Sequence, residues 1–229
     1  MLVGTGFTWS NLTDVDLYPD VYAKLALAVT STQLAKQNAV EEFGIGEDLP
    51  FMFLGWRDDF LSVMLAFSRA DMQMPVEQRI PKVDATCNVM RQAYWCDSIT
   101  FVAEGFMSKA PWELKGRELT EAFVAKDAKV TECITSSHVR FNRNGDPEVM
   151  LVSTPYNTIV GKHVVWGDQS AYSQGVGAVL QDAPILRVVI GALACTYERL
   201  DTDEQEELCG NLMSHGVNIQ EFEPPASSH

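Results

Sequence analysis

One asparagine–glycine pair restricts the fold of this chain more than any other feature. Asn144-Gly145 lies in the link "NRNGDP", between "VTECITSSHVRF" and "PEVMLVST", two stretches that read as strands. Asn-Gly is favoured in tight turns between antiparallel strands, because both residues tolerate a positive φ angle. The sequence therefore predicts an antiparallel pair over residues 129–154 and disfavours a doubly wound parallel sheet.

Further elements surround this pair. Helices are predicted over residues 19–43, 76–95 and 184–196 and from "DTDEQEEL" onward, and strands near 50–56, 60–68, 99–104 and 157–166. Pro155 and Tyr156 are expected to turn the chain into the last of these strands. The helix over 76–95 has the clearest pattern, a single apolar stripe formed by Ile80, Val83, Cys87, Met90 and Tyr94.

This order of elements indicates an α+β fold. We expect about six strands in a mainly antiparallel or mixed sheet, with helices packed against it. The chain of 229 residues is long enough to bury a sizeable core. A single domain is predicted over residues 1–217, followed by a flexible tail over residues 218–229.

The charge of the chain restricts its partners. It carries 31 acidic and 17 basic residues, a formal net charge of −14. Direct nucleic-acid binding is disfavoured, because phosphates are bound by clustered lysine and arginine. Acidic runs lie at residues 41–48, 58–59, 201–207 and 221–223. These runs are either solvated faces or contacts for a basic partner, which includes mimicry of the DNA backbone.

The cysteine pattern and the N-terminal sequence indicate a cytoplasmic protein. The five cysteines are scattered and none forms a Cys-x-x-Cys pair. This pattern is typical of reduced, buried thiols rather than of disulfides or a zinc site. The first residues, "MLVGTGFTWSNLTDVD", have no pattern of a secretory signal, and no segment is apolar for long enough to span a membrane.

Glu104 is the main candidate for a functional carboxylate. It lies in "WCDSITFVAEGFM", residues 95–107, where alternation places it on the strand face of Thr100 and Val102. If that face is open to solvent, Glu104 is an ordinary strand residue. If a helix covers the face, the carboxylate must be paired, because an isolated buried charge is costly.

A nuclease-like site can be built around this strand. Its pattern is an upstream acid, Asp97 or Glu104, followed by an acid-x-Lys triplet, so that two carboxylates hold a divalent ion beside a lysine. Glu113-Leu114-Lys115 fits the triplet, as does Asp127-Ala128-Lys129. Such triplets are frequent by chance in an acidic chain, and the negative charge further disfavours a nuclease.

A histidine cluster is the other chemical possibility. His138 and His163 lie on different predicted strands, and they could meet Glu104 or Glu132 if those strands share a face. No His-x-His or His-Glu-x-x-His spacing is present. We therefore predict no metal and no cofactor, and keep these histidines as candidates only.

One segment resembles part of a known group of proteins. Two parts of the chain are similar to small uncharacterised proteins encoded by actinobacteria and their phages. They are the helix-to-strand junction "AYWCDSITFVAEGFM" and the later strand pair "VTECITSSHVRF…PEVMLVSTPY". In that group a helix leads into a strand of the form A-D-x-V-x-F-V-x-E-x-W/F-M. The resemblance covers Asp97, Phe101, Val102, Glu104 and Phe106-Met107, with a looser similarity over residues 49–155. It implies an accessory protein of a phage or its host, and it brings no activity and no catalytic residues with it.

These observations favour a non-enzymatic, phage-encoded accessory protein in the cytoplasm of the host cell. It would inhibit or modulate a host or viral protein by direct contact, with the acidic surface against a basic partner, and it could also self-associate. The alternative is a metal-dependent hydrolase or nuclease built around Glu104. The two hypotheses differ in whether side chains such as Glu104, Asp97, His138 and His163 converge, which periodicity does not reveal.

Overall fold

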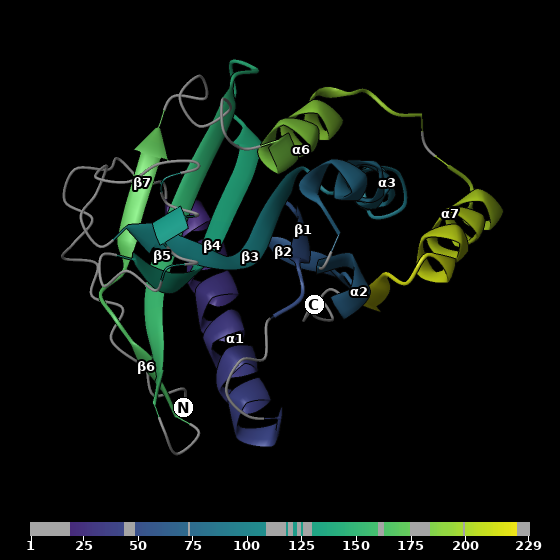
Figure 1. The fold of residues 1–229 in the computed structure, drawn as a ribbon. Coiled ribbons are helices and arrows are strands. Elements are labelled where there is room, and N and C mark those ends of the chain that lie inside the picture. The colour runs from purple at the N-terminus through teal and green to yellow at the C-terminus, as the bar shows by residue number, and fades with distance from the viewer. Residues whose placement is uncertain are drawn as a thin grey trace. The chain divides into compact units, whose positions relative to one another are not determined.

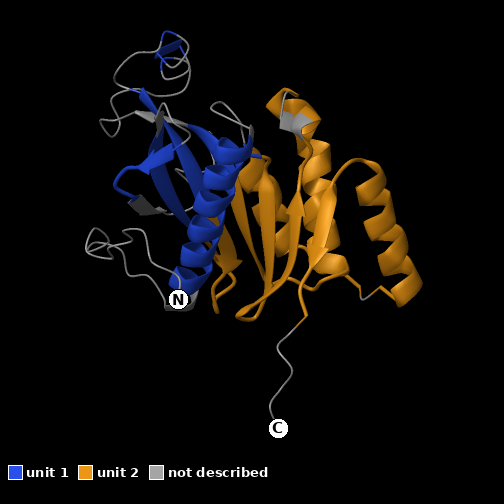
Figure 2. Cartoon of the chain, turned by 90° about the horizontal axis from the view of Figure 1, so that it is seen from below, with its two compact units in different colours: residues 1–49, 103–136, 150–173 blue, residues 50–102, 137–149, 174–229 orange. Residues whose placement is uncertain are grey.

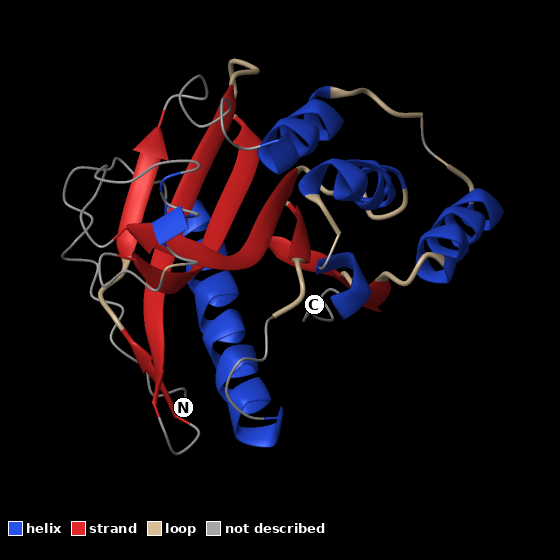
Figure 3. Cartoon of the chain, viewed as in Figure 1, coloured by secondary structure: helices blue, strands red, loops and turns tan. Residues whose placement is uncertain are grey.

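The computed structural model describes residues 19–43, 49–72, 74–108, 130–159, 163–174, 184–198 and 200–223, together with positions 118, 121, 122 and 125. Its helices are α1 (Pro19–Phe43), α2 (Arg69–Met72), α3 (Val76–Gln92), α6 (Pro184–Ala194) and α7 (Thr202–Ser214). Its strands are β1 (Met52–Arg57), β2 (Phe60–Ala66), β3 (Ser98–Ser108), β4 (Val130–Phe141), β5 (Pro147–Ile159), β6 (His163–Trp166), β7 (Ser170–Gln174) and β8 (Asn218–Glu221). Figures 1 and 3 show these elements, which confirm the predicted α+β class.

The strands form an antiparallel sheet, as the sequence predicted. Their hydrogen-bonded order is β6-β5-β4-β3-β1-β2-β8, and β7 pairs with β5. The eight strands exceed the six expected, because β7 and β8 were not predicted. Between β4 and β5, Gly145 has a φ of +81° and the Asn142 side chain accepts the backbone N–H groups of Asn144 and Asp146, both at 2.9 Å. The turn therefore forms where the Asn-Gly pair predicted it.

Two local predictions were wrong. The chain does not turn at Pro155-Tyr156: β5 continues to Ile159, and residues Tyr156–Ile159 pair with β6. A proline fits there because the pairing with β6 begins one residue later, while the Pro155 carbonyl still accepts the N–H of Gly167 at 2.8 Å. The expected tail also begins too early, because Asn218–Glu221 form β8 and pair with β2. Backbone pairing with four residues of β2 is enough to order this short, mostly polar segment.

The chain divides into two compact units (Figure 2). Unit 1 comprises residues 1–49, 103–136 and 150–173, and unit 2 comprises residues 50–102, 137–149 and 174–229. Both units are assembled from three separate stretches, and β3, β4 and β5 contribute residues to each.

In unit 1, α1 packs against β5 and β6. Val21, Leu25 and Val29 of α1 form a buried cluster with Met150 and Val152 of β5. These three helix positions are four residues apart, which places them on one face of the predicted helix. The packed face of α1 is nevertheless partly polar, because it also buries Lys24, Thr32, Gln33 and Lys36.

In unit 2, the strands bury a cluster of aromatic rings. Phe51, Phe53, Phe67 and Phe101 lie with neighbouring ring centroids 5.0 to 6.3 Å apart. Helix α3 packs against α6 and α7, and it buries the middle of the predicted apolar stripe, Val83, Cys87 and Met90.

The approach of α3 to β1 is close at Gly55. A Cβ atom there would lie 2.5 Å from Sγ of Cys96, 2.9 Å from Cγ1 of Val63 and 3.3 Å from Cε of Met90. Only a residue without a side chain fits at this point of the strand.

Candidate functional site

Glu104 lies beneath α1 and is fully paired. Its Oε1 atom is 2.6 Å from the Nζ atom of Lys36 and also accepts a hydrogen bond from the Tyr156 hydroxyl. Its Oε2 atom accepts the backbone N–H of Leu49 at 2.7 Å. The side chains of Lys36 and Glu104 are 2% and 7% exposed. Of the two outcomes that the sequence left open, the structure shows the buried one, in which the carboxylate must be paired.

These contacts make Glu104 a junction between elements of unit 1. Lys36 comes from α1 and Tyr156 from β5, while Glu104 belongs to β3. The Lys36 ammonium also lies 5.0 Å from the centroid of the Tyr156 ring, a cation–π contact. Because both carboxylate oxygens already accept hydrogen bonds from the protein, the cluster is built to hold α1 on the strands rather than to bind a metal ion.

Asp97 has a structural role in unit 2. Its Oδ2 atom accepts the backbone N–H of Asp58 at 2.7 Å, and its Oδ1 atom accepts the Ser98 hydroxyl at 3.0 Å. Asp58 adopts a φ of +54° in the turn between β1 and β2. Both carboxylate oxygens of Asp97 therefore accept hydrogen bonds, and Asp97 stabilises the turn between β1 and β2.

His138 belongs to a buried polar chain in unit 2. The Trp56 indole donates to the Thr100 hydroxyl at 2.8 Å, and that hydroxyl lies 2.9 Å from Nδ1 of His138. With its oxygen accepting from Trp56, the Thr100 hydroxyl is free to donate its proton to Nδ1, which then acts as the acceptor. His138 is only 1% exposed, so this chain is a buried link between β1, β3 and β4.

Of the remaining candidates, one histidine is described by the structure and the acid-x-Lys triplets are not. His163 is exposed at the start of β6, and Glu113 and Lys115 lie outside the residues that the structure describes, as does the triplet Asp127-Ala128-Lys129. Within the described part of the chain, no group of three or more histidine, cysteine, aspartate or glutamate residues is arranged to hold a metal ion.

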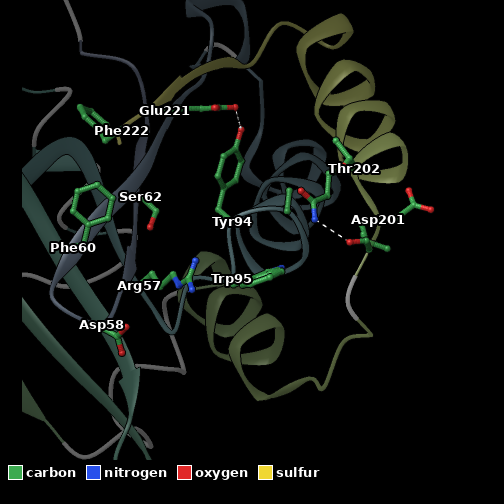
Figure 4. A pocket seen from close by; sticks show the side chains of 13 residues that line it. Arg57, Asp58, Phe60, Ser62, Tyr94, Trp95, Asp201, Thr202, Glu221 and Phe222 are labelled. Carbon is green, nitrogen blue, oxygen red and sulfur yellow. Dashed lines mark hydrogen bonds between the residues drawn. The ribbon is translucent and has the colours of Figure 1, made fainter. Parts of the chain in front are cut away.

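Unit 2 contains a groove lined by aromatic and charged side chains. Its volume is about 690 Å³, and it is formed where the end of α3, the β1–β2 turn, β8 and the start of α7 meet (Figure 4). We call it the α3–α7 groove. It is lined by Arg57, Asp58, Phe60, Ser62, Ala93, Tyr94, Trp95, Leu200, Asp201, Thr202, Gln205, Glu221 and Phe222.

An arginine stacked on a tryptophan forms one wall of the α3–α7 groove. The guanidinium of Arg57 lies 5.0 Å from the centroid of the Trp95 ring, which Figure 4 shows beside it. Trp95 adopts a φ of +54° just beyond α3, and its indole N–H donates to the Gln92 carbonyl at 3.1 Å. This turn directs the indole ring into the groove instead of continuing the helix. A positive φ at a bulky residue is costly, so it is held by these neighbouring contacts.

Tyr94 connects three elements around the α3–α7 groove. Its hydroxyl donates to Oε1 of Glu221 on β8 at 2.5 Å and lies 3.6 Å from Sγ of Cys209 on α7. Burial and the hydrogen bond to Glu221 raise the pKa of Tyr94, so the phenol stays protonated and acts as the donor. Burial also raises the pKa of the Cys209 thiol. Neither group is activated as a nucleophile or base, and together they hold β8 and α7 against α3.

The first turn of α7 is fixed by a capping box. The Asp201 side chain accepts the backbone N–H of Glu204 at 2.9 Å, and the Glu204 side chain accepts the N–H of Asp201 at 3.0 Å. The sequence predicted this helix start from its acidic residues, and the structure confirms it. The capped end places Asp201 and Thr202 on the rim of the α3–α7 groove.

We expect Tyr94→Phe to loosen β8 without unfolding the protein. The substitution removes the hydroxyl that donates to Glu221 and keeps the ring, so the loss should be about 1 kcal/mol. Hydrogen exchange of the β8 amides should become faster. Tyr197→Phe is the matched control, because it removes a hydroxyl that donates to Asn88 elsewhere in unit 2 at 2.6 Å. Equal exchange of β8 in both variants would contradict the role given to Tyr94.

The sequence contained the components of the α3–α7 groove without revealing their convergence. Three of the four acidic runs, at 58–59, 201–207 and 221–223, each place a carboxylate in its lining. The tyrosine of the α3 stripe and the tryptophan after it complete the wall. More than one hundred residues separate the first of these runs from the second, so periodicity within one element does not bring them together.

Comparisons with known proteins add no relative. No family model, curated protein or solved structure matches this chain. Among the described residues, the helices are either too short or too polar to cross a lipid bilayer.

Proposed function

We propose that this protein acts by binding another protein through the α3–α7 groove of unit 2, as a non-enzymatic accessory protein. The resemblance of residues 95–107 favours a role in a phage or its host cell. The proposal rests on one observation above all: three acidic runs that are distant in the sequence meet around one aromatic-walled groove.

The composition of the groove supports protein recognition. Tyrosine and tryptophan carry much of the binding energy in protein interfaces, and Tyr94 and Trp95 lie together here. Phe60 and Phe222 add apolar surface that a partner could cover. The polar groups at its centre are engaged with neighbouring side chains, Tyr94 with Glu221 and Arg57 with Trp95.

The alternative function, hydrolysis around Glu104, gains no support from the geometry. A catalytic carboxylate needs an oxygen free to reach substrate, water or metal. Both oxygens of Glu104 accept hydrogen bonds from Lys36, Tyr156 and Leu49, and the side chain is 7% exposed. The contacts are those of a structural ion pair.

Blocking the groove tests the proposal. Thr202→Trp places an indole at an exposed position on the rim, whereas Met213→Trp places the same indole at an exposed position of α7 outside the lining. We expect partners captured by the wild-type protein and by Met213→Trp, measured by cross-linking and quantitative mass spectrometry, to be lost from Thr202→Trp. Identical partners for both variants would show that the groove is not the contact surface.

A further inference from the structure

The α3–α7 groove is surrounded by negative charge. A second hollow of about 260 Å³, lined by Gln92, Leu200, Glu204, Glu207, Leu208 and Asn211, shares Leu200 with it. The residues lining the two hollows include five exposed carboxylates, Asp58, Asp201, Glu204, Glu207 and Glu221, against one guanidinium, that of Arg57. An acidic rim of this kind attracts a positively charged partner and repels an acidic one.

The aromatic wall adds a specific way to hold a cation. The guanidinium of Arg57 already lies over the Trp95 ring with its central carbon 5.0 Å from the centroid, within the range of a cation–π interaction. Phe60, Tyr94 and Phe222 provide further ring surface in the same groove. The protein thus binds one of its own cations in the manner that an incoming lysine or arginine would use.

We propose that the partner presents a basic peptide segment, and that one of its lysine or arginine side chains enters the α3–α7 groove. The aliphatic stem would pack on the aromatic rings, and the charged end would face Glu221. A neighbouring basic residue of the same segment would lie near Glu204 and Glu207 at the second hollow. This inference rests on the proposed function and adds the chemistry of the partner.

Removing the charge of Arg57 tests the inference, because a cationic and an anionic ligand predict opposite changes in affinity. If the groove takes a cation, Arg57 repels the ligand and occupies the Trp95 ring, so removing its charge should strengthen binding. If the groove takes an anion, Arg57 is its binding group and the same change should weaken binding. The substitution Arg57→Gln separates these two cases.

The probe is a heptapeptide with lysine or arginine at alternating positions and glycine between them, compared with a matched peptide that carries glutamate at those positions. Isothermal titration on the full chain should detect the basic peptide and not the acidic one, with an affinity that falls as salt is raised. We expect about threefold tighter binding to Arg57→Gln and about threefold weaker binding to Glu221→Gln, which still offers an oxygen to Tyr94. Asp146→Asn removes the same charge from the β4–β5 turn and should leave the affinity unchanged.

Other results would overturn the inference. These are tighter binding of the acidic peptide, weaker binding of the basic peptide to Arg57→Gln, equal effects of Glu221→Gln and Asp146→Asn, or no binding of the basic peptide. If the basic peptide fails while Thr202→Trp still loses its partners, the partner chemistry is wrong and the proposed function stands. If the basic peptide binds as expected while Thr202→Trp keeps its partners, the proposed function is wrong and the groove is a cation site of another kind.

Discussion

Glu104→Gln will destabilise the protein by about 3–5 kcal/mol, the cost of leaving one partner of a buried ion pair without its counter-charge. Lys36 is 2% exposed, and its ammonium lies 2.6 Å from the carboxylate that the substitution neutralises. The amide keeps the shape of the side chain, so the loss reflects charge rather than a cavity. Urea unfolding at neutral pH measures the change in the free energy of unfolding.

A second glutamate gives the matched control. Glu148 on β5 accepts a hydrogen bond from the Arg140 side chain at 2.9 Å, and its side chain is 30% exposed. Because this pair is close to solvent, Glu148→Gln should cost about 1 kcal/mol or less. A Glu104→Gln loss no larger than that of Glu148→Gln would contradict the structural role given to Glu104.

The pair can also be removed as a whole. Lys36→Met added to Glu104→Gln replaces the stranded ammonium with an apolar side chain of similar length, and most of the lost stability should return. Lys36→Met alone should be strongly destabilising, because it leaves the Glu104 carboxylate buried without its cation. If the double change cost as much stability as the sum of the two single changes, the two side chains would not be coupled.

Gly55→Ala has the second large expected effect, a loss of about 1–3 kcal/mol from overpacking. The added Cβ would lie 2.5 Å from Sγ of Cys96 and 2.9 Å from Cγ1 of Val63, both buried side chains. The pairing of β1 with β2 also shifts register between Gly55 and Trp56, so the strand is irregular at this point. Thermal unfolding should show a clearly lower midpoint.

Two further variants test whether overpacking causes the loss of stability in Gly55→Ala. Cys96→Ala removes the sulfur atom nearest to the new methyl group, so Gly55→Ala should cost less in that background than in the wild type. Gly191→Ala in α6 is the opposite control, because a Cβ there meets nothing within 4 Å. Alanine in a helix should stabilise by up to about 1 kcal/mol relative to glycine. A loss of stability from both glycine substitutions would contradict the packing explanation.

Elements with strong local signals were predicted well. The proline and aspartate that begin α1, the apolar stripe of α3, the alternation in β3 and the turn at Asn144-Gly145 all act within a few residues, and each element was found. Strand β8 was missed because its four residues, "NIQE", have little apolar pattern and are ordered by pairing with β2. Its stability comes from a partner about 150 residues earlier in the chain.

The candidate site was harder to predict for a related reason. Lysine side chains are usually exposed, yet Lys36 lies on the packed face of α1 and is buried with Glu104. The sequence identified Glu104 and stated the condition under which it must be paired, but the identity of the partner depends on how the helix packs. The α3–α7 groove likewise exists only after the β1–β2 turn, α7 and β8 come together.

The pairing of β2 with β8 has a consequence for how the protein is made. Strand β2 ends at Ala66, and its neighbour on one side, β8, begins only at Asn218. While the chain is being synthesised, that edge of β2 has no neighbouring strand until nearly all the described residues have left the ribosome. Exposed strand edges promote aggregation, so nascent chains and chains shortened before Asn218 share a vulnerable edge that the finished protein covers.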